Sequence, residues 1–328
     1  MVTTADFVGR RVVVEVPATI ANLGAGYDCV GLAIDLSLRV ELSVEHLPGN
    51  TATDLEIVGE GAGEIGPDRG NRFVEALETG LRGHGIGYNP GDAWRIRMTN
   101  EIPLARGLGS SGAATMAGLL AADALAGGDR ASPVTMADAE RGALLAAATA
   151  IEGHPDNIAP ALLGGFVAAA AATDGVTAFR FDAPDELRVV LFIPERRLPT
   201  AAMRRVLPAT VPRADAVANL ARVAIGVGGI AQGDWSVLGE LTQDRLHEPY
   251  RAAAYPQLPV LVAAARAAGA IGACLAGAGS TIAAFSLASD AVAERIGAAL
   301  TGVAAVHDLP GAVQIVHARN DGARVIER

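Results

Sequence analysis

Hydrophobic and polar positions alternate over several short stretches in the first half of the chain, and longer apolar stretches lie between them. A period of two predicts strands, whereas an extended apolar stretch predicts a helix. Strands are expected at residues 12–16, 36–44 and 94–98, and helices at residues 71–81, 113–125 and 136–151. Pro17 is expected to end the first strand, because proline lacks the backbone N–H that a strand ladder uses.

The second half of the chain mixes the same two patterns. We expect a buried strand at residues 187–193, helices at 214–230 and 260–268, and two strands joined by a turn within 271–287. The pattern therefore predicts strands and helices mixed in both halves of the chain. A boundary near residue 172 gives an N-terminal domain, 1–172, and a C-terminal domain, 173–328, without a Gly/Ser linker or an internal repeat between them.

Residues 267–289 carry no formal charge, and a stretch of this length could in principle cross a bilayer. Four glycines and four Ser or Thr residues interrupt it, and it lacks the dense Leu, Ile and Phe of a spanning helix. We therefore expect the buried pair of strands, and no membrane partner.

Composition excludes several classes of function. Of the 328 residues, 51% are hydrophobic, and the net charge of −10 offers nucleic acid no basic surface, so no nucleic-acid partner is expected. All 26 basic residues are Arg, which means that the sequence contains no lysine. A Walker-type phosphate loop, a protein-kinase fold and a pyridoxal-phosphate enzyme each need a lysine and are thereby excluded.

The two cysteines, Cys29 and Cys274, lie far apart and form no CxxC pair, so neither a disulfide framework nor a thiolate zinc site is expected. The six histidines show no metal-ligand spacing. The opening residues become charged at Asp6 and Arg10 before an apolar stretch develops, which does not fit a signal peptide. These features predict a cytoplasmic protein.

A glycine-rich segment before the helix at 113–125 is the most informative part of the sequence. It consists of Pro103, Leu104, Ala105, Arg106, Gly107, Leu108, Gly109, Ser110, Ser111, Gly112 and Ala113. Glycines remove the Cβ atoms that would keep an anion from the backbone, and the N–H groups of a helix N-terminus attract negative charge. The segment therefore predicts a phosphate site built without lysine, where serine hydroxyls can also serve as Mg²⁺ ligands.

Other interpretations of this segment are weaker. Gly107 to Gly112 spell GxGxxG, but Pro103 and Arg106 stand where a dinucleotide-binding unit has its strand directly before the glycines. A hydrolase elbow, G-x-S-x-G, would need a glycine where Ala113 stands. A glycine-rich helix start that only packs tightly is the remaining alternative.

Four further groups could carry chemistry. Asn22 and Asp28 lie among glycines in a loop and suit contacts to hydroxyl or ammonium groups, with an ordinary Asx turn as the alternative. Glu152 at a helix end could bind Mg²⁺, or could be a solvated surface group. It is followed by His154, Asp156 and Asn157, which could face an acceptor. Gly277 lies in a small-residue turn. A carboxylate could be held by Arg204 and Arg251.

Six segments together resemble the GHMP kinase superfamily, and most closely its homoserine kinase branch. They are VPATIANLGAGYD, IPLARGLGSSGAA, EGHPDNIAPALLGG, PTAAMRRVLP, DRLHEPYR and LAGAGST, in this order along almost the whole chain. The resemblance implies ATP- and Mg²⁺-dependent phosphorylation of the side-chain hydroxyl of L-homoserine to O-phospho-L-homoserine, for threonine synthesis. It also implies a homodimer, and a two-domain α+β fold with an N-terminal domain like ribosomal protein S5 domain 2 and a ferredoxin-like C-terminal domain.

Site residues follow from the same resemblance, motif by motif. The segment 103–113 would wrap the ATP phosphates, with Ser111 and Glu152 near Mg²⁺. The residues expected around the amino acid are Asn22, Asp28, His154, Thr200, Arg204, Arg251 and Gly277. Asn157 matches a position where many superfamily members have a catalytic Asp, so we assign no general base, and Asp156 is the alternative that a variant can test.

Three departures from the family pattern concern the acceptor pocket. Ala276 and Ser280 replace a usual serine and proline, Tyr27 stands where Phe is common, and Arg204 lies beside Arg205, so that either could meet the carboxylate. Two other functions therefore stay open. One is a kinase for another small alcohol, and the other is a sensor that binds nucleotide without consuming it.

Overall fold

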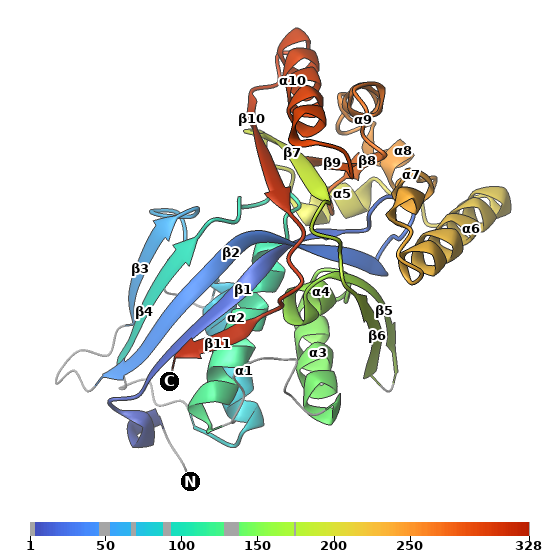
Figure 1. The fold of residues 1–328 in the computed structure, drawn as a ribbon. Helices are drawn as coiled ribbons and strands as arrows, with labels where there is room; N and C mark the ends of the chain where they lie inside the picture. The colour runs from blue at the N-terminus through green and yellow to red at the C-terminus, as the bar shows by residue number, and fades with distance from the viewer. Residues whose placement is uncertain are drawn as a thin grey trace.

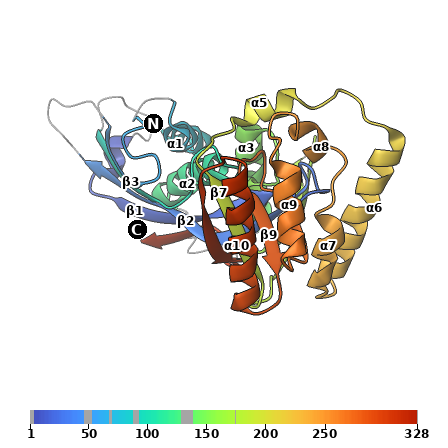
Figure 2. The same ribbon diagram turned by 90° about the horizontal axis from the view of Figure 1, so that it is seen from above.

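The computed structural model of the chain describes residues 4–45, 53–66, 70–87, 93–127, 138–173 and 175–327. Its strands form two sheets, one of seven strands and one of four, and helices pack against each of them (Figures 1 and 2). The described elements mix helices and strands in both halves of the chain, as the α+β prediction requires.

The first sheet has the strand order β11-β1-β2-β4-β3, and β5 and β6 extend it from β2. Its strands are β1 (Arg11–Ala21), β2 (Val30–Glu45), β3 (Asp54–Gly59), β4 (Ala93–Asn100), β5 (Phe166–Ala172), β6 (Gly175–Phe181) and β11 (Arg324–Glu327). The pair β3 and β4 is parallel, and the other pairs are antiparallel.

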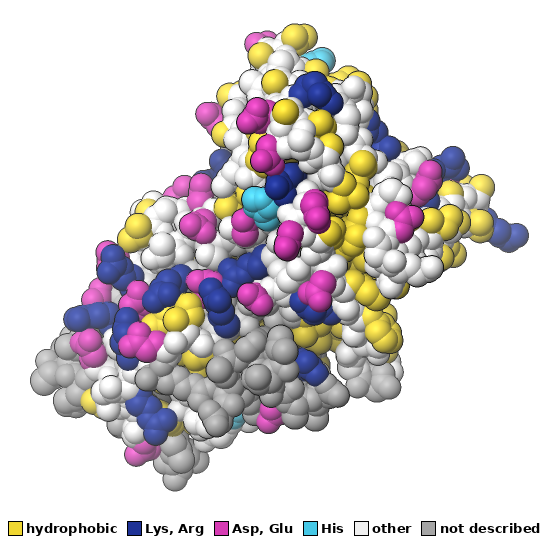
Figure 3. Space-filling model, viewed as in Figure 1, with side chains coloured by type: hydrophobic (Ala, Val, Ile, Leu, Met, Phe, Trp, Pro, Cys, Tyr) yellow, Lys and Arg dark blue, Asp and Glu magenta, His cyan; other side chains and the backbone are white. Residues whose placement is uncertain are grey.

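Alternation along β2 places one face of this sheet in the core and the other toward solvent. The open face carries basic and acidic side chains on neighbouring strands, and Figure 3 shows them as interspersed blue and magenta atoms. Arg11 pairs with Glu41 at 2.7 Å, and Arg97 pairs with Glu56 at 3.5 Å. Exposed pairs of this kind contribute about 0–1 kcal/mol each, so the buried face stabilises the sheet far more.

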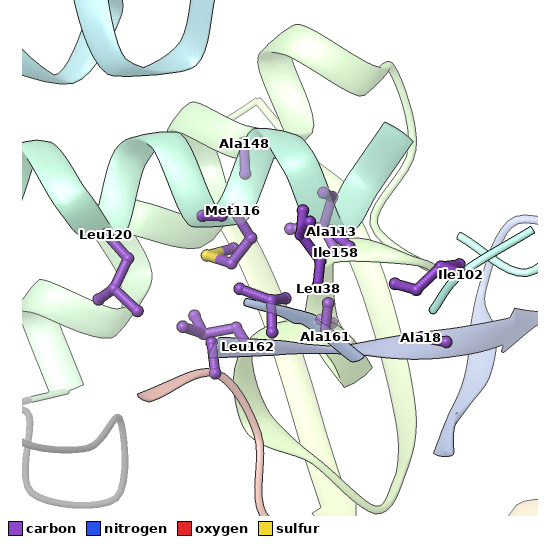
Figure 4. Close-up of a cluster of buried hydrophobic side chains, with 14 of the residues drawn as sticks. Ala18, Leu38, Ile102, Ala113, Met116, Leu120, Ala148, Ile158, Ala161 and Leu162 are labelled. Atoms are coloured by element: carbon purple, nitrogen blue, oxygen red, sulfur yellow. The ribbon is translucent and has the colours of Figure 1, made fainter. Parts of the chain in front are cut away.

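Helices of the first half cover the buried face of the first sheet. They are α1 (Arg72–Gly83), α2 (Ser110–Leu125), α3 (Asp138–Glu152) and α4 (Ile158–Leu163), preceded at the start of the chain by the 3₁₀ turn η1 (Thr4–Phe7). Met116 and Leu120 of α2 point toward Leu162 of α4 and the strands below (Figure 4). Both side chains of α2 are fully buried, and each such residue contributes about 1.5–3 kcal/mol.

The second sheet is antiparallel, with the order β10-β7-β9-β8. Its strands are β7 (Arg188–Pro194), β8 (Gly272–Leu275), β9 (Ile282–Ser286) and β10 (Gly311–His317). The helical elements of this half are α5 (Thr200–Arg205), α6 (Arg213–Ile230), η2 (Trp235–Val237), α7 (Leu238–Leu241), α8 (Glu248–Arg251), α9 (Leu258–Ala267) and α10 (Asp290–Val306). This β-α-β-β-α-β order is the ferredoxin-like arrangement expected of the C-terminal domain.

The chain crosses from the first sheet to the second between β6 and β7 and returns to the first sheet with β11. The boundary predicted near residue 172 therefore falls inside the β5–β6 hairpin, whose strands pair along their whole length. The crossing between the two sheets lies in the connection after Phe181. The sequence pattern did not reveal the β5–β6 hairpin, so it did not predict this position.

Several predicted elements are confirmed with longer bounds, and one expectation is wrong. Strand β1 does not end at Pro17 but continues to Ala21, because the register with β2 shifts between Pro17 and Ala18 and accommodates the missing N–H. Helix α2 begins at Ser110, three residues before the predicted start. The predicted start of the next helix, Met136, lies outside the described residues.

The uncharged stretch 267–289 contains β8 and β9, which pair with each other and are buried, as predicted. Among the described residues, no helix combines the length and the apolar character that a membrane span requires.

Candidate functional site

A cavity of about 370 Å³ contains nearly all of the predicted site residues. Its lining comes from the loop after β1, the glycine-rich segment before α2, the end of α3 and its following loop, α5, α8, and the turn after β8. The predicted residues that line it are Asn22, Asp28, Pro103, Ala105, Arg106, Gly107, Leu108, Gly109, Ser110, Ser111, Gly112, Glu152, His154, Asp156, Asn157, Thr200, Arg204, Arg251 and Gly277. The cavity therefore joins parts of both halves of the chain.

Leu104 and Ala113 were predicted with the phosphate segment but do not line the cavity. Ala113 is fully buried and points into the core beside Ile158 (Figure 4). The side chain of Leu104 lies against Gly61. Side chains of a continuous segment at a helix start point in several directions. Those of Leu104 and Ala113 pack against other parts of the protein and not toward the cavity.

Glycines hold the predicted phosphate segment close to its neighbours. Gly107 and Gly109 have φ values of +81° and +75°, a region that other residues rarely adopt. A Cβ on Gly107 would lie 2.0 Å from the carbonyl oxygen of Ala276, and one on Gly109 would lie 2.1 Å from Thr19 Oγ1. The absence of side chains thus permits the segment to fit between β1 and the turn after β8.

Helix α2 starts at this segment with Gly109 as its N-cap, which has no side chain to bond the first N–H groups. Those N–H groups and the positive end of the helix dipole face the cavity, where Ser110, Ser111 and Gly112 form part of the lining. This arrangement suits a phosphate group.

Two hydroxyl groups and one carboxylate meet beside the start of α2. Ser111 Oγ donates to Glu152 Oε1 at 2.9 Å, and Thr115 Oγ1 donates to the same oxygen at 2.8 Å. The side chain of Glu152 is 11% exposed, and Arg72 Nε lies 3.8 Å from its Oε1 atom. Three oxygen-bearing side chains in this arrangement form a donor set of the kind that Mg²⁺ prefers.

Arg106 lines the cavity, but its guanidinium group is committed to the protein. It donates to the backbone carbonyl groups of Leu104 at 3.0 Å, Pro194 at 2.9 Å and Glu195 at 3.2 Å. These bonds tie the glycine-rich segment to the end of β7, so the side chain anchors the segment.

Asn22 and Asp28 lie in a strained turn at the opposite end of the cavity. Their φ values are +71° and +57°, and Leu23 between them has +45°; such conformations cluster at functional sites. Asn22 Oδ1 accepts from the backbone N–H of Asp28 at 3.0 Å, while Asn22 Nδ2 donates to the Gly277 carbonyl at 2.9 Å. The Asx-type bond therefore exists, and it orients two polar side chains at the cavity.

Arg204 forms a bidentate ion pair with Asp28. Its Nη2 atom lies 2.7 Å from Asp28 Oδ1 and its Nη1 atom 3.1 Å from Asp28 Oδ2, while Nη1 also donates to the Tyr27 hydroxyl at 2.9 Å. The hydrogen bond that Arg204 donates to Asp28 raises the pKa of Arg204. Arg205 is exposed and does not line the cavity, so Arg204 is the arginine of this pair that faces the cavity.

Arg251 reaches the cavity from a buried position, with 1% of its surface exposed. Its Nη1 atom donates to the Gly277 carbonyl at 2.7 Å and to His247 Nδ1 at 3.0 Å. A guanidinium group can only donate, so His247 Nδ1 must accept the bond from Arg251. The Gly24 carbonyl can only accept, so His247 Nε2, 2.8 Å away, must donate to it. The imidazole is therefore neutral, with its proton on Nε2. Burial lowers the pKa of His247 to about 4, which agrees with this tautomer.

His154, Asp156 and Asn157 share the loop that follows α3. His154 Nδ1 lies 2.5 Å from Asp156 Oδ1, and the side chain of Asp156 is 2% exposed. Burial lowers the pKa of His154, but the hydrogen bond and charge of Asp156 outweigh it and leave that pKa raised. Asn157 accepts a hydrogen bond from Thr19 Oγ1 at 2.8 Å, which fixes its side chain beside Gly109.

Some functional positions were missed by sequence reasoning. Ala21, Arg72, Ala201 and Ala278 also line the cavity. Tyr27 and His247 contact its arginines; the sequence marks Tyr27 only as a departure from the family pattern. Arg72 follows the N-cap of α1 and gave no signal in the sequence. His247 lies in the segment DRLHEPYR, so its position was noted but its role was not.

Comparisons with known proteins identify the family of the chain. The family model described as the GHMP kinases N terminal domain matches residues 71–165, and the model described as GHMP kinases C terminal matches residues 227–304. The two matched regions carry the phosphate segment, Glu152, Arg251 and the turn at Gly277.

Relatives extend the similarity over most of the chain. A homoserine kinase of Moorella thermoacetica is 38% identical over 313 residues, which cover 95% of this chain and 99% of that protein. A homoserine kinase of Thermus thermophilus is 40% identical over 276 residues, 84% of this chain and 87% of that protein. The crystal structure of a homoserine kinase from Cytophaga hutchinsonii matches with a TM-score of 0.81 and 29% identity, covering 96% of this chain and 97% of that one.

Proposed function

The chain belongs to the GHMP kinase family, and from this premise we propose that it transfers the γ-phosphoryl group of ATP to the side-chain hydroxyl of L-homoserine. The products would be ADP and O-phospho-L-homoserine, an intermediate for threonine synthesis. The names of the relatives support homoserine as the acceptor, since they cover most of this chain at 38–40% identity.

One observation carries the proposal: a single cavity joins an anion-binding helix start to a pocket with two arginines and an aspartate. An amino acid carries an ammonium and a carboxylate group, and Asp28 and Asn22 suit the first, while Arg204 and Arg251 suit the second. Thr200 and Gly277 complete the wall of this pocket. A phosphoryl donor and an amino-alcohol acceptor would therefore meet in the middle of the cavity.

The residues at the start of α2 fit a Mg²⁺–triphosphate group. Ser111 and Glu152 would hold the metal, since their oxygen atoms lie 2.9 Å apart beside the helix start, and Thr115 adds a third oxygen. The backbone of Gly107 to Gly112 would bind the phosphates in place of a lysine. When bound, Mg²⁺ neutralises phosphate charge and orients the transferred group.

Catalysis in this proposal rests on positioning and charge stabilisation, and no side chain serves as an obligatory general base. Asn157, held by Thr19, would orient the acceptor hydroxyl next to the helix start. The hydroxyl proton would pass to phosphate or water. Asp156 would act through His154, whose imidazole it holds at 2.5 Å.

Three finer points belong to the same proposal. We expect a homodimer, as the family resemblance implies, and a cytoplasmic location. The two cysteines are free thiols, which fits a reducing compartment. Residues 1–172 and 173–328 remain our proposed division into domains, with the observed crossing between sheets a little later.

A coupled ADP-release assay tests the function. The purified protein is offered homoserine, threonine, serine, mevalonate and galactose in turn, with and without Mg²⁺. We expect ADP only when both homoserine and Mg²⁺ are present. Turnover with another alcohol would identify a sister kinase, and nucleotide binding without turnover of any alcohol would favour a sensor.

A further inference from the structure

Tyr27 contacts both arginines that face the acceptor pocket. Its ring centroid is 5.6 Å from Arg204 Cζ and 5.6 Å from Arg251 Cζ. The ring of His247 packs against it at 5.2 Å between centroids. A tyrosine face attracts a guanidinium group at this distance, so one ring contacts two like charges at once.

The two guanidinium groups repel each other, and each is desolvated to some extent. Burial lowers the pKa of Arg251, and the charge of Arg204 acts in the same direction, while Tyr27 and Asp28 oppose the change. An aromatic ring within cation–π distance of both groups offers each of them a negative surface. Tyr27 thereby allows two cations to share one small pocket.

The hydroxyl group of Tyr27 has a separate contact. It accepts a hydrogen bond from Arg204 Nη1 at 2.9 Å, and the same nitrogen also bonds Asp28. Asp28 holds Arg204 through both carboxylate oxygens. A substrate ammonium group would compete with Arg204 for Asp28. The hydrogen bond to the Tyr27 hydroxyl would then still hold Arg204, because the substrate ammonium does not compete for that hydroxyl.

We propose that Tyr27 is a positioning residue that aims Arg204 and Arg251 at the α-carboxylate of the acceptor and so sets the selectivity for a substrate carrying that group. The inference rests on the proposed function and deepens it. Phenylalanine at this position would supply the ring without the hydroxyl, so the two contributions can be separated.

Two variants and two acceptors test the proposal. Tyr27→Leu removes the ring and the hydroxyl, and Tyr27→Phe removes the hydroxyl alone. The acceptors are L-homoserine and its carboxamide, which keeps the amine and the alcohol but lacks the carboxylate charge. Phe179→Leu is the matched control, because Phe179 is 65% exposed on β6 and lies outside the cavity.

For Tyr27→Leu we expect the KM for homoserine to rise about tenfold, equivalent to about 1.4 kcal/mol, with kcat and the KM for ATP within about twofold of wild type. The preference for homoserine over the carboxamide should fall by a similar factor. Tyr27→Phe should keep most of this preference and raise the KM for homoserine about threefold, about 0.65 kcal/mol. Phe179→Leu should match wild type in every parameter.

An unchanged preference for homoserine over the carboxamide in both variants would overturn the proposal. Equal losses of activity toward the two acceptors would also overturn it, because they would indicate a merely structural role of Tyr27. Should Tyr27→Leu fail to fold, the KM shift of Tyr27→Phe decides, because that change keeps the ring and its packing. A wild-type protein that phosphorylates no homoserine refutes the proposed function as well, whereas an active wild type with unaltered variants refutes the role of Tyr27 alone.

Discussion

Replacing Asp156 with Asn separates two ways in which this residue could serve phosphoryl transfer. The substitution keeps the shape of the side chain but removes the charge that faces His154 Nδ1 at 2.5 Å. A hydrogen bond to a charged group in a buried setting contributes about 1.5–3 kcal/mol, and Asp156 is only 2% exposed. If Asp156 acts by holding His154, kcat/KM for homoserine should fall about tenfold to hundredfold.

The pKa of His154 gives a second readout of the same variant. Asp156 raises this pKa against the effect of burial, which lowers it. In Asp156→Asn the burial effect remains while the raising effect is lost, so the imidazole should titrate at a lower pH than in wild type. Proton NMR of the His154 ring across pH 5 to 9 would measure the shift.

A surface pair provides the control for this substitution. Asp35 and His317 also face each other, at 3.5 Å, but their side chains are 45% and 50% exposed and lie away from the cavity. Asp35→Asn should leave kcat/KM unchanged. A loss greater than about a thousandfold in Asp156→Asn, with the KM for ATP unaltered, would refute the reasoning and identify Asp156 as the general base.

Two other predictions concern backbone fit and pH. Gly109→Ala should lower the free energy of unfolding by about 2 kcal/mol or more and reduce kcat, because the new Cβ would lie 2.1 Å from Thr19 at a φ of +75°. Gly85→Ala is the control, because Gly85 has a φ of +70° but open space around it. It should lower the free energy of unfolding by about 1 kcal/mol without affecting kcat. His247 stays neutral in the folded protein down to a pKa of about 4, while the unfolded chain protonates near its ordinary pKa of 6.5, so stability should fall as the pH drops through this interval. His247→Gln should remove about 2 kcal/mol of the difference in unfolding free energy between pH 6.5 and 4.5, measured by urea denaturation, and an identical pH dependence in both proteins would contradict the assignment.

The parts of the site that could be predicted from the sequence are those whose chemistry is local. The segment from Gly107 to Ser111 carries its own explanation, because glycines, serines and a following apolar helix act within one turn of chain. Arg251 and Glu152 were located through their motifs. The faces of the phosphate segment were not separable, so Leu104 and Ala113 were included although their side chains pack away from the cavity.

The parts that could not be predicted depend on distant contacts. Residues 166–172 are rich in alanine, which favours helix in isolation, yet they form β5 because β2 and β6 pair with them. The contact between Tyr27 and Arg204 joins positions 177 residues apart, and that between His247 and Gly24 spans 223 residues. No pattern of neighbouring letters encodes such pairs.

The last strand, β11, lies at one edge of the first sheet and pairs with β1, the first strand of the chain. During translation, the first half of the chain would therefore leave the ribosome with that edge of β1 bare, because β11 follows β1 only after about 300 further residues. Completion of the sheet requires that the second half of the chain be synthesised first. A ribosome-bound chain that stops before β11 would thus expose a sheet edge to aggregation, which links the folding of the two halves as closely as the shared cavity links their chemistry.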